Sequence, residues 1–160
     1  MKEDLRIAAG LDCGCGTVEL STLDDYGQPE LIPNQQNEEI MPAAVYFDPQ
    51  DNAVVGSEAL SERFVEPTRV FRFFKTLMRK AKALFCDGSG KEYRAKDLYS
   101  LLIKKAVTDG SARLGRTIKE IVLTVPANWG SIERTGAKEA AKEAGVTALE
   151  LLSEPTAACL

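Results

Sequence analysis

The stretch that decides the fold is "AGLDCGCGTVEL", residues 9–20, in which an apolar run ends in an aspartate and two closely spaced glycines. Residues 7–11 form a nearly continuous apolar run, which is typical of a strand that is covered on both faces. Residues 17–23 alternate between apolar and polar side chains and predict a second strand. The pattern therefore predicts a tight hairpin with one acid at the end of its first strand.

This hairpin is suited to bind a phosphate group through its backbone. Glycines let the main chain come within hydrogen-bond reach of a ligand, and consecutive amides form a concave anion site. Asp12 would repel a phosphate by itself, so its position makes sense if a hydrated Mg²⁺ lies between the two. An ordinary glycine-rich hairpin with a surface aspartate explains this stretch equally well.

Two common nucleotide-binding motifs do not fit the sequence. The Gly-x-Gly of the hairpin has Glu19 where a dinucleotide-binding fingerprint needs its third glycine, and a strand follows it instead of a helix. The stretch "GSGKEY" ends like a Walker A loop, but Phe85 and Glu92 occupy the positions that require Gly and Ser or Thr. Neither a Rossmann nor a P-loop site is therefore predicted.

Cys13 and Cys15 also allow a metal or redox interpretation. Residues at i and i+2 of a strand lie on the same side, so we expect the two thiols to face one way. A structural zinc site needs four ligands, and Cys86 and Cys159 are far away in the sequence. Structural cysteines are therefore the better interpretation.

Composition limits the remaining classes of function. The 160 residues, 44% of them apolar, suffice for one domain or two small subdomains with a real core. A net charge of −4 offers no basic surface for nucleic acid or acidic membranes. Four sparse cysteines, a charged N-terminal stretch and the lack of an 18-residue apolar run predict a soluble cytoplasmic protein.

The sequence contains no histidine, which excludes Ser-His and Cys-His nucleophiles and histidine metal sites. Any chemistry must therefore use carboxylates, lysine, backbone amides or a bound ion.

Periodicity along the chain predicts an α/β fold with a mixed sheet and flanking helices. After the hairpin, the predicted strands are residues 30–33, 43–48, 53–56, 118–126 and 148–153. The predicted helices are residues 57–64, 70–85, a long helix within 91–115, residues 131–144 before Gly145, and a last helix that begins at Glu154.

Four segments together closely resemble the N-terminal lobe of an Hsp70 (DnaK-type) molecular chaperone. They are "GLDCGCGTVEL", "GQPELIPNQQNEEIMPAAVYF", "VFRFFKTLMRK" and "IVLTVPANWGSIERTGAKEAAKEAGVTALELLSEPTAACL", in this order. The last one is the most specific, through its "TVPA…R…A…AAG…EPTAA" pattern. The resemblance spans residues 5–160 and implies one lobe of an actin-like ATPase, with an RNase H-like fold. Residues 1–37 and 116–160 would form one subdomain and 38–115 an inserted α/β subdomain, whereas the second lobe and the peptide-binding domain are absent.

The resemblance implies roles for particular residues. Asp12 would contact the water shell of Mg²⁺, Lys75 would reach the γ-phosphate and the attacking water, and Glu154 would organise the metal–water network. The loop around the phosphates would consist of Gly14, Cys15, Gly16 and Thr17, and the residues that couple nucleotide state to the substrate domain would be Pro126 and Arg134. The implied cofactors are ATP or ADP with Mg²⁺. The implied partners are unfolded polypeptides, a J-domain co-chaperone and a nucleotide exchange factor, with no nucleic acid and no membrane.

The hairpin departs from the family pattern. The family usually has Gly-Thr-Thr where this chain has Gly14-Cys15-Gly16, so two hydroxyl donors to phosphate are missing. A hydrogen bond to a charged acceptor is worth about 1.5–3 kcal/mol, which predicts slower hydrolysis. Half of a composite site cannot preorganise a transition state, so we expect the isolated chain to be inactive. A non-catalytic interaction protein of the same fold, or another actin-like kinase, stays open as an alternative.

Overall fold

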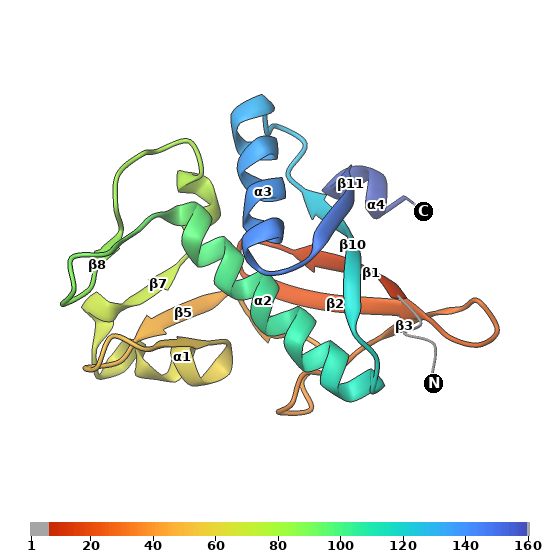
Figure 1. Cartoon of the computed structure of the whole chain (residues 1–160), viewed down its shortest axis with the longest axis horizontal. Coiled ribbons are helices and arrows are strands. Elements are labelled where there is room, and N and C mark those ends of the chain that lie inside the picture. The colour runs from red at the N-terminus through yellow and green to blue at the C-terminus, as the bar shows by residue number, and fades with distance from the viewer. Residues whose placement is uncertain (1–6, 160) are drawn as a thin grey trace.

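The computed structural model describes residues 7–159 and contains a mixed six-stranded sheet, shown in Figure 1. Three strands form an antiparallel meander at one side: β1 (Ile7–Cys13), β2 (Thr17–Leu23) and β3 (Pro29–Leu31). On the other side β10 (Ile118–Val125) lies parallel to β1, and β11 (Thr147–Ser153) lies parallel to β10. The short strand β4 (Met41–Pro42) also pairs with β2. The predicted α/β class with a mixed sheet is therefore confirmed.

The predicted hairpin is present, and its alternation decides which side chains face the core. Leu11 is paired with Leu20 and Cys13 with Val18, and all four of these side chains are buried. Asp12 points to the opposite face and is exposed. The acid is thus held on the open face of the sheet at the end of β1.

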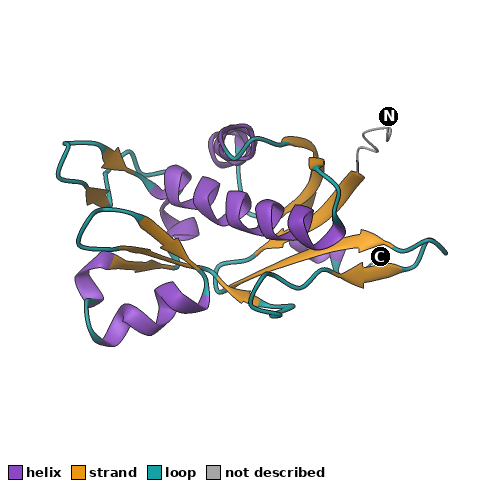
Figure 2. Ribbon diagram, turned by 60° about the horizontal axis from the view of Figure 1, so that its bottom comes forward, coloured by secondary structure: helices purple, strands orange, loops and turns teal. Residues whose placement is uncertain are grey.

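Two helices cover the other face of the sheet, as Figure 2 shows: α2 (Ala95–Leu114) and α3 (Ser131–Glu143). At the crossing of α2 over β2, a Cβ added to Gly110 would lie 2.2 Å from the Leu20 side chain, so only glycine allows this close approach. α3 packs through Ala137, Ala140 and Ala141, which are fully buried. The predicted stop of this helix is confirmed, because Gly145 adopts a φ of 90° directly after the C-cap residue Ala144.

The middle of the chain forms a smaller layer beside the main sheet. Its three-stranded sheet consists of β5 (Ala44–Phe47), β6 (Ala53–Val55) and β7 (Val70–Arg72), with α1 (Ser57–Ser61) packed against it. A short hairpin, β8 (Phe85–Cys86) and β9 (Glu92–Tyr93), adds aromatic side chains to this layer. The rings of Phe47 and Phe85 stack with centroids 4.1 Å apart. The predicted hairpin of residues 43–48 and 53–56 and the short helix from Ser57 are confirmed.

The helix predicted over residues 70–85 is wrong. Val70–Arg72 form strand β7, which pairs with β5, and Phe74–Leu77 form one turn of 3₁₀ helix, η3. Between them Phe73 has a left-handed φ of 55°, which a continuous α-helix cannot contain. β-branched and aromatic residues fit a strand as well as a helix, so their spacing was ambiguous. The turn directs Phe74 and Lys75 into the core.

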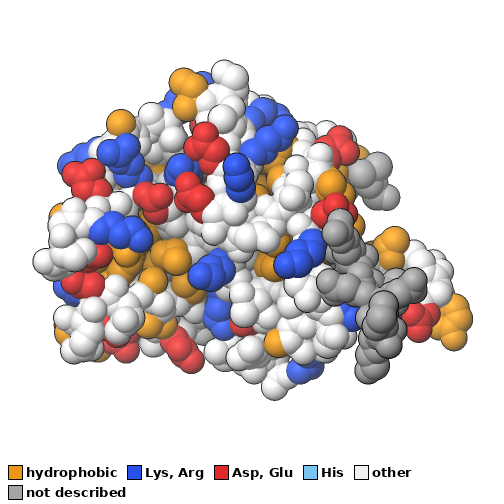
Figure 3. All heavy atoms as spheres, in the orientation of Figure 1, with side chains coloured by type: hydrophobic (Ala, Val, Ile, Leu, Met, Phe, Trp, Pro, Cys, Tyr) orange, Lys and Arg blue, Asp and Glu red, His pale blue; other side chains and the backbone are white. Residues whose placement is uncertain are grey.

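The core is continuous between the two layers. α2, which falls in the range expected for an inserted subdomain, packs on β1, β2 and β10 as well as on β5 and β6. The division into residues 1–37 with 116–160 and residues 38–115 therefore stays a prediction. Acidic and basic side chains are interspersed on the face shown in Figure 3. Within residues 7–159, no helix is both long and apolar enough to cross a membrane.

Candidate functional site

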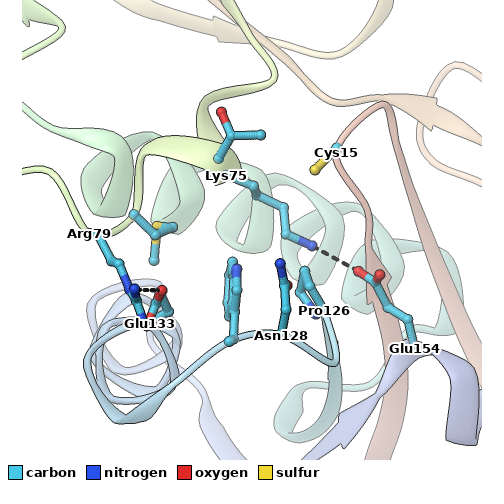
Figure 4. A pocket seen from close by; sticks show the side chains of 10 residues that line it. Cys15, Lys75, Arg79, Pro126, Asn128, Glu133 and Glu154 are labelled. Atoms are coloured by element: carbon cyan, nitrogen blue, oxygen red, sulfur yellow. Dashed lines mark hydrogen bonds and ion pairs between the residues drawn. The ribbon is translucent and has the colours of Figure 1, made fainter.

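Lys75 is the most unusual buried residue of the described chain. Its side chain is only 1% exposed, although lysine is rarely buried without a partner. The ammonium donates hydrogen bonds to the carbonyl oxygen of Cys13 and to Oε1 of Glu154, the latter at 3.2 Å. These two acceptors come from the end of β1 and from α4 (Glu154–Ala157), the short helix that follows β11. Lys75 thus joins three segments that are far apart in the sequence, as Figure 4 shows for the carboxylate.

Two aromatic rings complete the surroundings of this ammonium. Its Nζ lies 5.2 Å from the ring centroid of Trp129 and 5.6 Å from that of Tyr99, within the range of a cation–π interaction. The two rings meet edge to face, with centroids 6.1 Å apart. Oxygen acceptors and aromatic faces together compensate for the loss of hydration around the charge.

A pocket of about 460 Å³ opens beside Lys75. It is lined by residues of the hairpin, of η3 and the segment after it, of the loop after β10, and of α3 and α4: Cys15, Lys75, Thr76, Met78, Arg79, Pro126, Asn128, Trp129, Glu133 and Glu154. In Figure 4 the Lys75–Glu154 pair lies at one side of the pocket and the Arg79–Glu133 pair at the other. The structure therefore brings four of the nine predicted site residues, Lys75, Glu154, Cys15 and Pro126, to one cavity.

The two hairpin cysteines do not face the same way, so that expectation was wrong. β1 ends at Cys13, which is fully buried, whereas Cys15 lies in the turn, is exposed and lines the pocket. Burial raises the pKa of the Cys13 thiol to about 12, despite the opposing effect of the Lys75 charge. A strand alternates its faces only as far as it continues, and here β1 ends at Cys13, before Cys15 is reached.

Gly14 and Gly16 play different steric roles in this turn. A Cβ at Gly14 would lie 3.2 Å from the carbonyl oxygen of Thr17, a tight contact with backbone. A Cβ at Gly16 would have no atom within 4 Å, and neither glycine has a positive φ. A side chain at Gly14 would thus press on the backbone of the turn, whereas Gly16 leaves an open space beside the exposed Thr17.

Asp12 is held from a neighbouring strand and lies outside the residues that line the pocket. Thr124 on β10 donates a hydrogen bond from Oγ1 to Oδ1 of Asp12, at 2.6 Å. This contact fixes the exposed carboxylate and leaves Oδ2 available to a ligand. Among residues 7–159, no group of three or more His, Cys, Asp or Glu side chains is placed to hold a metal ion. A cation here would thus be held largely by water and by its ligand, as Mg²⁺ commonly is.

Arg134 supports the loop after β10 and lies outside the pocket lining. Its Nε donates to the carbonyl oxygen of Trp129 at 3.1 Å. Pro126 begins the same loop and accepts a backbone hydrogen bond from Trp129 at 3.1 Å. The two residues predicted to act in coupling therefore both bond the backbone of Trp129, whose ring forms an aromatic wall of the pocket.

Glu133 fixes the far wall of the pocket. It is buried, accepts a hydrogen bond from the amide of Gly130 at 3.1 Å and forms an ion pair with Arg79. Burial acts to raise the pKa of Glu133, but backbone hydrogen bonds and the Arg79 guanidinium outweigh it and hold the pKa below its usual range.

A pH dependence of stability follows from this carboxylate. A depressed pKa contributes stability that is complete above the unfolded value of about 4.3 and is lost as the pH falls through the lower folded value. We therefore expect the parent chain to lose more free energy of unfolding than Glu133→Gln between about pH 7 and about pH 3, measured by urea titration. The exposed Glu30→Gln is the control and should behave like the parent. An equal loss in the parent and in Glu133→Gln would contradict this assignment.

Sequence reasoning missed three residues that shape the site: Tyr99, Trp129 and Thr124. Tyr99 lies on the apolar face of α2, and Trp129 follows a strand in a loop, so each looked like ordinary packing. Thr124 precedes the "VP" of the specific block, and its place next to Asp12 follows only from the parallel pairing of β10 with β1. Only its position at the carboxyl end of a predicted strand indicated that Thr124 could lie near the site.

The chain is similar in sequence to known proteins along its whole length. The sequence model of a family described as "Hsp70 protein" matches residues 79–160, which include Pro126, Arg134 and Glu154. The chain is 31% identical to proteins named "Chaperone protein DnaK" from Thermotoga petrophila, Thermotoga neapolitana and Thermotoga maritima. These alignments cover 100% of this chain and 26% of each relative, so the chain spans about a quarter of their length. A family match over half of the chain, with similarity along all of it, shows that the chain belongs to the Hsp70 family.

Proposed function

We propose that this chain is the N-terminal lobe of an Hsp70-type ATPase domain, with the actin-like, RNase H-like fold of that class, and that it binds the phosphates of ATP or ADP. The observation that carries the proposal is the convergence of Cys15, Lys75 and Glu154, from three distant segments, on one pocket. A buried ammonium beside a half-exposed carboxylate is a suitable arrangement for a phosphate and its counter-ion. Family membership supports the same conclusion.

Each residue has a distinct part in this proposal. Backbone amides of Gly14, Cys15, Gly16 and Thr17 would bind the β- and γ-phosphates. Lys75 would place its charge at the γ-phosphate, where negative charge develops as water attacks. Asp12 and Glu154 would orient the water shell of Mg²⁺, since carboxylate oxygens suit this ion. When bound, Mg²⁺ supplies neutralisation of the phosphate charge.

The activity of the whole protein is also part of the proposal. The matched relatives are about four times longer than this chain, so the second lobe and the peptide-binding domain would belong to a longer protein. In that protein Pro126 and Arg134 would couple nucleotide state to the binding of unfolded polypeptides. A J-domain co-chaperone and a nucleotide exchange factor would act on it, in the cytoplasm. The isolated chain would bind nucleotide weakly and show no steady hydrolysis, because half of the donors are missing.

One observation favours a second function, that of a non-catalytic interaction protein. The turn has Cys15 and Gly16 where hydroxyl donors are usual in the family, and a Cβ at Gly16 would find only open space within 4 Å. Backbone amides can still bind phosphate without the two side-chain hydroxyls, whereas catalysis loses two hydrogen-bond donors. Steady hydrolysis by the longer protein would exclude the second function.

Protection of Cys15 from alkylation tests nucleotide binding on the chain itself. We expect iodoacetamide to modify the exposed Cys15, Cys86 and Cys159, whereas Cys13 stays unmodified because it is buried and has a pKa of about 12. At Mg·ATP ten times above the dissociation constant, the modification rate of Cys15 should fall about tenfold. Peptide mass spectrometry measures each site, and Cys86 serves as the internal control.

Two outcomes would contradict the proposed site. In one, Cys15 reacts at the same rate without Mg·ATP and with Mg·ATP at ten times its dissociation constant. In the other, Cys15 and Cys86 are slowed equally, which would indicate a general effect on the chain. Mg²⁺ with adenosine is the matched ligand control, because it lacks the phosphates and should give no protection.

A further inference from the structure

We propose that Tyr99 and Trp129 are positioning residues that hold the Lys75 ammonium at the phosphate end of the pocket. We call these two rings the aromatic cage. The role of the cage in hydrolysis rests on the proposed function. Its geometry rests only on contacts among the described residues.

Lys75 needs positioning because of its side chain and its place in the chain. A lysine carries its charge on a flexible four-carbon stem and loses much rotamer freedom when it is fixed. Here the stem starts from a single 3₁₀ turn that follows the left-handed Phe73, and not from a long helix. Backbone structure alone therefore constrains the ammonium weakly.

Hydrogen bonds fix part of its position and leave one donor for a ligand. An ammonium has three N–H donors, and two of them are directed to the carbonyl of Cys13 and to Glu154. The third would be available to a phosphate oxygen in the pocket. Two hydrogen bonds alone still allow the group to rotate about the line between their acceptors, so a further restraint is needed.

The aromatic cage supplies this restraint from two other elements. Tyr99 comes from α2 and Trp129 from the loop after β10, and the edge-to-face contact between the rings sets their planes 74° apart. Each ring presents a π-system to Nζ within about 6 Å. Displacement of the ammonium away from either ring weakens a favourable interaction. The rings therefore define the position that the hydrogen bonds leave open.

The ring of Tyr99, and not its hydroxyl, carries this role. The hydroxyl is fully buried, and no hydrogen bond joins it to Lys75. Tyr99→Phe therefore removes no contact to Lys75, whereas Tyr99→Leu removes the π-system. The pair of variants separates ring from hydroxyl at the same position.

Nuclear magnetic resonance of the chain with ¹³C at lysine Cε tests the cage without nucleotide. Ring currents should displace the Lys75 ε-methylene signal from those of exposed lysines such as Lys104. We expect Tyr99→Leu and Trp129→Leu each to move the signal back toward the exposed-lysine position, and Tyr99→Phe to leave it in place. If neither leucine variant moves the signal, the cage does not exist. Because Tyr99 is buried, Trp129→Leu decides the test if Tyr99→Leu fails to fold.

Hydrolysis by the longer protein tests the functional half of the inference. Trp129→Leu and Tyr99→Leu should lower kcat between about tenfold and a hundredfold, the cost of a misplaced reacting group, with little change in KM. Tyr99→Phe should keep the parent rate. In a Lys75→Met background the same changes should have no further effect on kcat, because the cage acts through Lys75.

If the leucine variants lower kcat by the same factor in the parent and in the Lys75→Met background, the cage does not act through Lys75. Such a result would overturn its role in hydrolysis and indicate general structural damage. A parent protein that hydrolyses no ATP would contradict the proposed function, while the resonance of Lys75 would still decide on the cage. The two failures are therefore distinguishable.

Discussion

Replacement of Lys75 by methionine is expected to lower the rate of ATP hydrolysis by the longer protein about 10²–10³-fold, the usual cost of removing one preorganised group. ADP affinity should stay within about tenfold, which corresponds to about 1.4 kcal/mol. The ammonium acts where charge develops on the γ-phosphate, and ADP has no such group. Single-turnover hydrolysis and ADP titration measure the two quantities separately.

Methionine is chosen because it keeps most of the volume of the buried stem. Lys75→Ala would add a cavity beside Tyr99 and Trp129, and its effect on folding would be mixed with the loss of charge. Lys104→Met on the exposed side of α2 is the matched control and should hydrolyse ATP like the parent. An unchanged rate in Lys75→Met would show that the buried ammonium has no part in phosphate chemistry.

The elements that the sequence predicted well are those in which one pattern admits one structure. Alternation from Thr17 to Leu23 could only bury Val18 and Leu20 together, and Gly145 marked the end of α3 because a left-handed residue is needed there. The position of the acid in the hairpin also followed from local pattern. Strands, turns and helix stops of this kind depend on neighbours in the chain.

The elements that it predicted poorly depend on distant neighbours. Apolar residues at 70, 71 and 74 suit a helical face and a strand equally. Val70–Arg72 form a strand because they pair with β5. The aromatic cage joins α2 to a loop thirty residues later, through the fold of the sheet between them. A single sequence contains no signal for such a contact, because each aromatic residue is also explained by packing alone.

In the candidate site, too, local sequence pattern alone did not identify the residues that distant contacts bring together. Lys75 and Glu154 were predicted through resemblance to a family, since each taken alone would be a surface charge or a helix-start acid. The structure places them 3.2 Å apart, although 79 positions separate them in the sequence. Their roles in hydrolysis remain proposals, which the variants above address.

Restoring the family hydroxyls in the hairpin, Cys15→Thr with Gly16→Thr, is the second change with a large expected effect. Each hydroxyl would donate to a charged phosphate oxygen, which is worth about 1.5–3 kcal/mol, or roughly ten- to a hundredfold. We expect tighter Mg·ATP binding or faster hydrolysis by at least about tenfold, since one good hydrogen bond suffices for this gain. Isothermal titration and steady-state assays of the longer protein measure it.

The backbone of the turn is ready for this change. Gly16 lacks a positive φ and a Cβ there meets open space, so a β-branched residue fits without strain. Gly14→Thr is the matched control, because its Cβ would press on the carbonyl of Thr17 at 3.2 Å and distort the turn. This control should weaken binding of Mg·ATP, although it adds the same hydroxyl.

The double variant also decides between the two functions that the hairpin leaves open. If the turn binds phosphate and its missing hydroxyls limit the rate, the variant gains activity that Gly14→Thr does not. If neither the parent nor the double variant binds or hydrolyses ATP, the added hydroxyls have no phosphate to meet. The hairpin would then be a structural turn of a non-catalytic Hsp70-family protein, and the exposed Cys15 would lie beside a pocket with another purpose.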